Sequence, residues 1–141
     1  MASPPKDPWL IHFFERHKDD DSELAVPAVD FLESVPPKVA AEIHAVLGAV
    51  AAAPPPSFSG GGKWEAMHGD MSGYFEVRVQ GGGMNHRLFC VLERDAEDLG
   101  GSSIVCIDGL SKAPRTAAQP RDYMRVKRYG DEFRKRRTVL E

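Results

Sequence analysis

Two arginines in the middle of the chain occupy positions from which they could act together on one phosphate. Arg78 lies in YFEVRVQ, residues 74–80, and Arg87 lies in HRLFCVLE, residues 86–93. Both segments alternate between apolar and other side chains, which is typical of β-strands with one buried face. If the strands pair, directly opposite side chains lie about 5 Å apart. The planar donor fork of arginine binds two phosphate oxygens at once, so the pattern indicates a shared phosphate site.

The arginines have an alternative role as partners in surface ion pairs. Glu76 lies two residues before Arg78, and Glu93 ends the next strand-like segment. Exposed ion pairs of this kind are common and contribute little to stability. The two segments alone do not decide between the phosphate site and the ion pairs.

Two other kinds of site lack the required spacing. His68 and Asp70 are two residues apart and His86 is distant in sequence, which does not match a metal-ligand motif. The glycine-rich residues 60–63 are followed by Trp64 and not by the Ser or Thr of a phosphate loop. We therefore expect no metal and no cofactor.

Positive charge is concentrated late in the chain. Residues 110–137 carry 10 Lys and Arg against 3 Asp and Glu, a balance of +7, although the whole chain has a net charge of −3. Residues 1–60 carry 4 against 9, a balance of −5. This asymmetry indicates contact with a polyanion, and the alternative is a solvated helix face.

The elements around these residues predict an α+β domain. Strands are expected at 9–16, 74–80, 86–93 and 104–108, and helices at 28–35, 38–53 and 120 to about 137. Residues 57–62 are expected to be a flexible connector, residues 63–71 a short strand or an ordered loop, and residues 109–118 a loop. We predict a flexible tail at 1–8 and a single domain at 9–141. In it, an N-terminal strand and a helical hairpin pack on a mainly antiparallel sheet, followed by a basic C-terminal helix.

The last predicted helix has two faces. At 100° per residue, one sector holds the side chains suited to packing on a sheet: Tyr123, Val126, Tyr129 and Phe133. The opposite sector holds basic side chains: Arg121, Arg125, Arg128 and Lys135. Gly130 costs a helix about 1 kcal/mol relative to alanine, so the last turns are expected to fray without a partner.

Cysteine usage and hydropathy indicate a cytoplasmic protein. Cys90 and Cys106 lie in apolar runs and are expected to be buried free thiols in a reducing compartment. Residues 1–8 lack the apolar region of a secretory signal. No stretch reaches the ~18 apolar residues that a membrane helix requires, so no membrane partner is expected.

Four segments in this order resemble the RelE/ParE toxin superfamily, and more narrowly its phage-derived, HigB-like branch. They are GYFEVRV, HRLFCVL, IVCIDGLSK and RDYMRVKRYGDEFRKR, within residues 64–137. The resemblance implies the RelE fold and the toxin of a type II toxin–antitoxin module. Such toxins cleave mRNA, usually on the ribosome and without a metal. The resemblance also implies a cognate helix-turn-helix antitoxin encoded nearby.

Carried over by position, the resemblance matches Arg78, Arg87 and Lys112 to basic residues of the family's sheet, and it places Tyr123 and Arg125 on the C-terminal helix. The chemistry of RNA cleavage suggests roles for the candidates. Arg78, Arg87 and Lys112 would stabilise the charge that builds on the phosphoryl oxygens. Tyr123 and Tyr129 on the last helix could stack on a base or protonate the leaving group, and at least one of them is expected to pack on the sheet instead. The chain departs from the branch in two respects. Its usual double lysine is the single Lys112 preceded by Ser111, and the N-terminal lead is longer.

Proton transfer and RNA binding need further residues. A general acid or base should titrate near neutrality, which His86 or His68 does by type, although either is also compatible with an ordinary surface position. The helix residues expected to bind RNA are Arg121, Arg125, Arg128, Tyr129 and Lys135.

Two other functions stay open. One is a non-enzymatic, ParE-like inhibitor of gyrase, and the other is an accessory protein that binds nucleic acid or a partner without cleaving. The strand arginines favour the nuclease, because binding alone does not need a focused cationic pocket. The lack of an obvious general base leaves the alternatives open. The sequence also leaves open whether the acidic N-terminal lead contacts the antitoxin, the ribosome or nothing.

Overall fold

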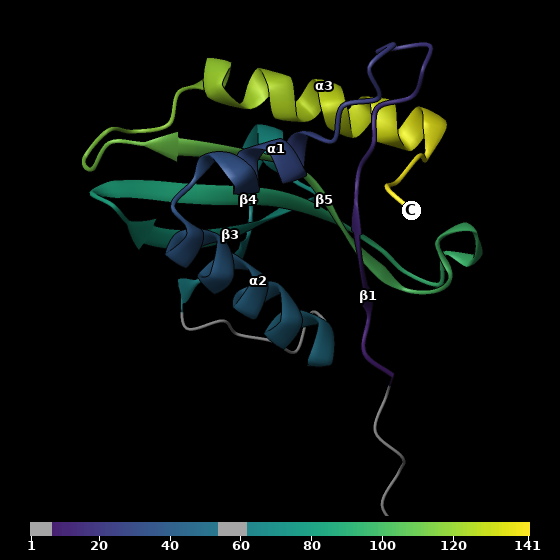
Figure 1. Cartoon of the computed structure of the whole chain (residues 1–141), viewed down its shortest axis with the longest axis horizontal. Coiled ribbons are helices and arrows are strands. Elements are labelled where there is room, and N and C mark those ends of the chain that lie inside the picture. The colour runs from purple at the N-terminus through teal and green to yellow at the C-terminus, as the bar shows by residue number, and fades with distance from the viewer. Residues whose placement is uncertain (1–6, 54–61) are drawn as a thin grey trace, which may run out of the picture.

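The fold is a five-stranded sheet with helices on both faces (Figure 1). The computed structural model describes residues 7–53 and 62–141, so residues 1–6 of the predicted tail and 57–61 of the predicted connector lie outside it. The strands are β1 (Leu10–Phe13), β2 (Trp64–Ala66), β3 (Tyr74–Gly81), β4 (Met84–Glu93) and β5 (Ser103–Lys112). The helices are α1 (Pro27–Ser34), α2 (Pro37–Ala52) and α3 (Pro120–Arg136), with short 3₁₀ turns at Gly69–Met71 and Glu97–Leu99.

The sheet has the strand order β1-β5-β4-β3-β2. β1 runs parallel to β5, and the other neighbours are antiparallel. This arrangement confirms the predicted α+β class and the mainly antiparallel sheet. The division into a tail at 1–8 and a domain at 9–141 stays a prediction.

The predicted alternation of the strands is confirmed by two separate apolar clusters. On one face, Val77, Leu88 and Cys90 pack with α1 and α2. On the other face, Phe89 and Val91 pack with Val126 and Phe133 of α3. Both cysteines are free and fully buried, and burial raises the pKa of the Cys90 thiol.

Two glycines at which the sequence suggests the end of a strand or a weakened helix are sites of close packing. The prediction that a loop begins at Gly109 was wrong, because β5 continues to Lys112. A Cβ at Gly109 would overlap the ring of Phe31 in α1, so glycine is needed within the strand. Gly130 is likewise buried in α3, where a Cβ would overlap the hydroxyl of Tyr74. Gly130 therefore marks a contact with the sheet.

The N-terminal lead is held against the end of α3. Arg16 binds Glu132 at 2.9 Å, and Arg136 lies 3.5 Å from Asp20. The acidic segment after β1 thus neutralises part of the basic helix of its own chain.

The C-terminal residues extend the sheet beyond β1. Phe14 forms an antiparallel bridge with Val139, and the amide of Leu140 donates to the carbonyl of Phe13 at 2.8 Å. The end of β1 therefore lies between β5 and the C-terminal segment. Within the described ranges, no helix is long and apolar enough to cross a membrane.

Candidate functional site

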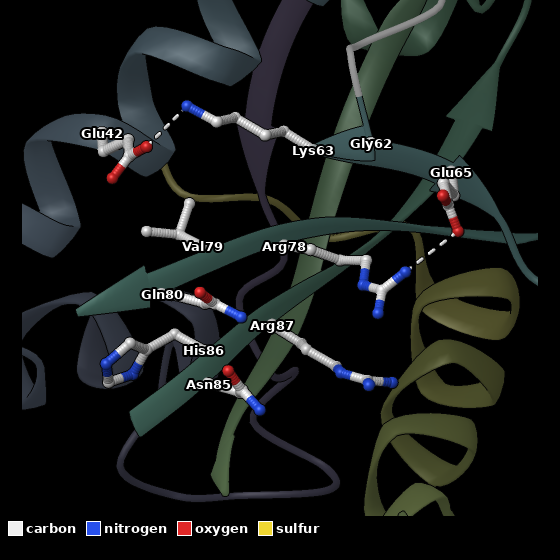
Figure 2. Close-up of a pocket in the computed structure, with 10 residues that line it drawn as sticks. All are labelled: Glu42, Gly62, Lys63, Glu65, Arg78, Val79, Gln80, Asn85, His86 and Arg87. Atoms are coloured by element: carbon white, nitrogen blue, oxygen red, sulfur yellow. Dashed lines mark hydrogen bonds and ion pairs between the residues drawn. The ribbon is translucent and has the colours of Figure 1, made fainter. Parts of the chain in front are cut away.

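The two strand arginines face each other across the β3–β4 pair. Arg78 and Arg87 are direct partners in the register. Figure 2 shows both guanidinium groups directed to the side of the sheet on which α3 lies. They line an open hollow of about 500 Å³, together with Glu65 and the end of the β3–β4 hairpin. The predicted juxtaposition of the arginines is confirmed.

The prediction of a focused cationic pocket at these arginines was wrong, because carboxylates balance them. Arg78 lies 3.2 Å from Glu65 and 3.5 Å from Glu76, and Arg87 lies 3.5 Å from Glu76. The ion-pair alternative is therefore confirmed for Glu76. It was wrong for Glu93, which pairs with Arg137 at 3.1 Å.

Glu76 is a candidate for proton transfer that the sequence analysis did not select. Its residue surface is only 6% exposed, although its carboxylate lies between two guanidinium groups. Burial raises the pKa of Glu76 above its usual value, and the charges of Arg87 and Arg78 oppose that rise. The sequence pattern indicates this position, because Glu76 is two residues from Arg78 and so lies on the same face of the strand.

Tyr123 reaches the same site from the first turn of α3. Its hydroxyl is 3.4 Å from Nη1 of Arg87. Its ring packs edge-on against Phe89, with ring centres 5.7 Å apart. The packing fixes the phenol while the hydroxyl stays beside the guanidinium.

Lys112 lies on the same face of the sheet at the end of β5. Its register partner on β4 is Asn85, two residues from Arg87. The Nζ of Lys112 is 3.0 Å from Asp122, which also accepts a 2.7 Å hydrogen bond from the amide of Gln119. These interactions, the Gln119 bond foremost, lower the pKa of Asp122 and tie Lys112 to the start of α3.

His86 does not share this face of the sheet. Its position is therefore unfavourable for the catalytic role that was predicted for it. It is adjacent to Arg87 in β4, so its ring points to the opposite side of the strand (Figure 2). The ring is buried, with Nδ1 2.7 Å from Ser111 Oγ and Nε2 2.9 Å from the carbonyl of Gly81. Because a carbonyl can only accept, Nε2 carries the proton. The other histidine, His68, is exposed ahead of a 3₁₀ turn.

The five α3 residues expected to bind RNA divide into two groups. Arg121, Arg128 and Lys135 are exposed, and no carboxylate pairs with them in the described part of the chain. Arg125 instead binds the buried Asp108 at 2.7 Å, and Tyr129 packs between the guanidinium groups of Arg16 and Arg128. Burial raises the pKa of Asp108 although Arg125 opposes the rise. Arg125 and Tyr129 thus have structural contacts that helix-face analysis did not reveal.

No group of three His, Cys, Asp or Glu side chains within residues 7–53 and 62–141 is placed to hold a metal ion. No family model matches the chain, and no curated protein matches its sequence. Among solved structures, the chain is similar to one in the toxin–antitoxin complex RelBE2 from Mycobacterium tuberculosis. The two are 14% identical with a TM-score of 0.47, over 72% of this chain and 95% of that one. This likeness concerns the overall arrangement of the elements alone.

Proposed function

We propose that the protein is the toxin of a type II toxin–antitoxin module and cleaves ribosome-bound mRNA as a metal-independent endoribonuclease. The observation that carries the proposal is the arrangement of Arg78, Arg87, Glu76 and Tyr123 on one face of the sheet. Together they supply phosphate ligands, a proton acceptor and a hydroxyl. The sequence resemblance to the RelE/ParE superfamily supports the same activity, with a helix-turn-helix antitoxin as partner in the cytoplasm.

The proposed reaction is attack by the RNA's own 2′-hydroxyl on the adjacent phosphorus. The carboxylate of Glu76 accepts the 2′ proton as the new P–O bond forms. Arg87 and Lys112 stabilise the negative charge of the phosphorane. The bond from phosphorus to the 5′-oxygen then breaks, and this oxygen takes a proton from the hydroxyl of Tyr123. The products are a 2′,3′-cyclic phosphate and a 5′-hydroxyl, and exchange with water restores both side chains.

Substrate binding requires one of the arginine ion pairs, Arg78–Glu65, to open while the pairs with Glu76 stay closed. The Arg78–Glu65 pair is weak, since its side chains are 44% and 50% exposed. Glu76 is buried beneath both arginines. An incoming phosphate therefore displaces Glu65 from Arg78 and leaves Glu76 in place as the proton acceptor.

Primer extension on cellular transcripts after induced expression tests this proposal. We expect cuts inside translated regions that disappear when the start codon of the reporter transcript is removed. An Arg87→Ala protein expressed to the same level is the control and should leave transcripts intact. Uncut transcripts together with cleaved gyrase–DNA complexes would replace the nuclease with the gyrase inhibitor.

A further inference from the structure

A second basic hollow lies at the start of α3. It is open, has a volume of about 740 Å³, and is lined by the loop after β5 and the first turn of the helix. Lys112, Arg115 and Arg121 contribute three positive charges to its wall. No carboxylate of the described residues lines it, and Asp122, which follows Arg121, is bound to Lys112 and to the backbone amide of Gln119. The hollow therefore keeps a balance of two positive charges.

The hollow is positively charged because two of its basic side chains form no ion pair with a carboxylate among the described residues. Within the described residues, carboxylates pair with half of the ten basic side chains of residues 110–137: Lys112, Arg125, Arg134, Arg136 and Arg137. Arg115 and Arg121 are exposed and have no such pair there. Their guanidinium donors are thus available to an external anion. Pro120, at the helix start, has no N–H and so contributes no backbone donor to the hollow.

The hollow is continuous with the arginine face of the sheet. Lys112 lines it and is also close to Arg87, because the register partner of Arg87 is Leu110, two residues before Lys112. Such diagonal neighbours on paired strands are about 7–8 Å apart. That separation is comparable to the step between consecutive phosphates of an extended strand. A polyanion lying on Arg78 and Arg87 would therefore reach the hollow within a few nucleotides.

We propose that Arg115 and Arg121 bind a backbone phosphate of RNA that lies a few nucleotides from the phosphate held by Arg78 and Arg87. This inference rests on the proposed function and extends its substrate path around the start of α3. The site recognises the phosphodiester and not the base, because guanidinium groups and Lys112 are its charged donors. The RNA is either the message or a ribosomal strand, since both present the same chemistry.

The salt dependence of RNA binding tests this site directly. The probe is a short single-stranded RNA with every 2′-hydroxyl methylated, so that it binds without being cut. For single strands, the slope of log K against log salt concentration changes by about 0.7 for each phosphate neutralised. We expect the Arg115→Ala/Arg121→Ala protein to lose about this much slope. The Arg115→Lys/Arg121→Lys protein should keep it, because lysine retains the charge.

A matched control is Lys18→Ala, which removes an exposed cation beside the residues that contact the far end of α3. Its slope should equal that of the unchanged protein. A second set of titrations uses ribosomes without mRNA. A loss of slope on the oligonucleotide assigns the site to the message, and a loss on ribosomes alone assigns it to ribosomal RNA.

Unchanged slopes in both titrations would overturn the inference, while transcript cleavage by the unchanged protein would still support the proposed function. An unchanged protein that binds neither probe and cuts no transcript would overturn both. Melting temperatures of all variants confirm that the substitutions leave the fold intact.

Discussion

The Oε2 atom of Glu76 lies 3.5 Å from Nη1 of Arg87, although the glutamate is buried in the face of a sheet. Burial raises the pKa of the carboxyl, whereas the two strand arginines favour its ionised form. A carboxylate held in this balance can accept a proton and release it again.

Replacing Glu76 with Gln should lower the rate of RNA cleavage by about 10²- to 10⁴-fold. In the unchanged protein, activity should rise with pH as Glu76 ionises, at a pH above the usual carboxyl value of 4.5, because the pKa is raised. The variant should lack this acidic limb in a pH profile of kcat/KM. Glu65→Gln is the control. It should keep the acidic limb and move it to lower pH, because the negative charge of the exposed Glu65 contributes to raising the pKa of Glu76. An acidic limb that persists in the Glu76 variant would assign the proton acceptor elsewhere.

Arg87→Ala should abolish growth arrest on induction while leaving the far-UV circular dichroism spectrum unchanged. Arg87 is half-buried at the centre of the site, where it contacts both Glu76 and Tyr123. Arg87→Lys should restore part of the activity, because it keeps the charge but loses the two-oxygen fork. Full toxicity of the alanine variant would show that the site is wrongly assigned.

Arg125→Ala should reduce stability more than RNA affinity. It removes the partner of the buried Asp108 and should cost about 1–3 kcal/mol in the free energy of unfolding. Lys135→Ala is the matched control on the same helix, because Lys135 is exposed, and it should change the free energy of unfolding by less than about 0.5 kcal/mol. Denaturant titrations measure both.

The Arg125 effect should also depend on pH. The pKa of Asp108 is raised by burial, so the stability linked to its protonation is lost as pH rises through that pKa. Without Arg125 the pKa of Asp108 rises further. The variant should therefore lose more stability near pH 7 than near pH 3.8, the usual pKa of an aspartate side chain. A difference that does not vary with pH would contradict this coupling.

Gly130→Ala should destabilise the protein, although alanine is the better helix former. The added Cβ overlaps the Tyr74 hydroxyl, and overpacking of this kind costs about 1–3 kcal/mol. The hydroxyl is buried and has no hydrogen-bond partner among the described residues. Tyr74→Phe should therefore be nearly neutral alone and should reduce the cost of Gly130→Ala, as thermal unfolding of the double variant would measure. Equal costs in both backgrounds would exclude the proposed overlap.

Strand alternation was enough to predict where Arg78 and Arg87 lie, because period-two patterns fix which side chains share a face. The same rule places His86 on the other face of the sheet from Arg87, and Glu76 on the same face as Arg78. The positions of His86 and Glu76 relative to the arginines could therefore also be predicted from the sequence. The end of β5 was not, because Gly109 looks like a strand terminator until the ring of Phe31 is seen against it.

Ion pairs between distant segments were likewise out of reach of sequence patterns. Arg136 pairs with Asp20, and Arg137 with Asp98, only because the fold brings these segments together. Charge counting therefore overestimated how much of the basic helix is free for a polyanion.

The pairing of β1 bears on how the chain folds. Its partners are β5 on one side and the segment around Val139 on the other, so both neighbours come from far along the sequence. Contacts of such large sequence separation slow folding, because the loop-closure entropy is lost before they form. During synthesis β1 therefore stays without its partners until β5 and the segment around Val139 have both emerged from the ribosome.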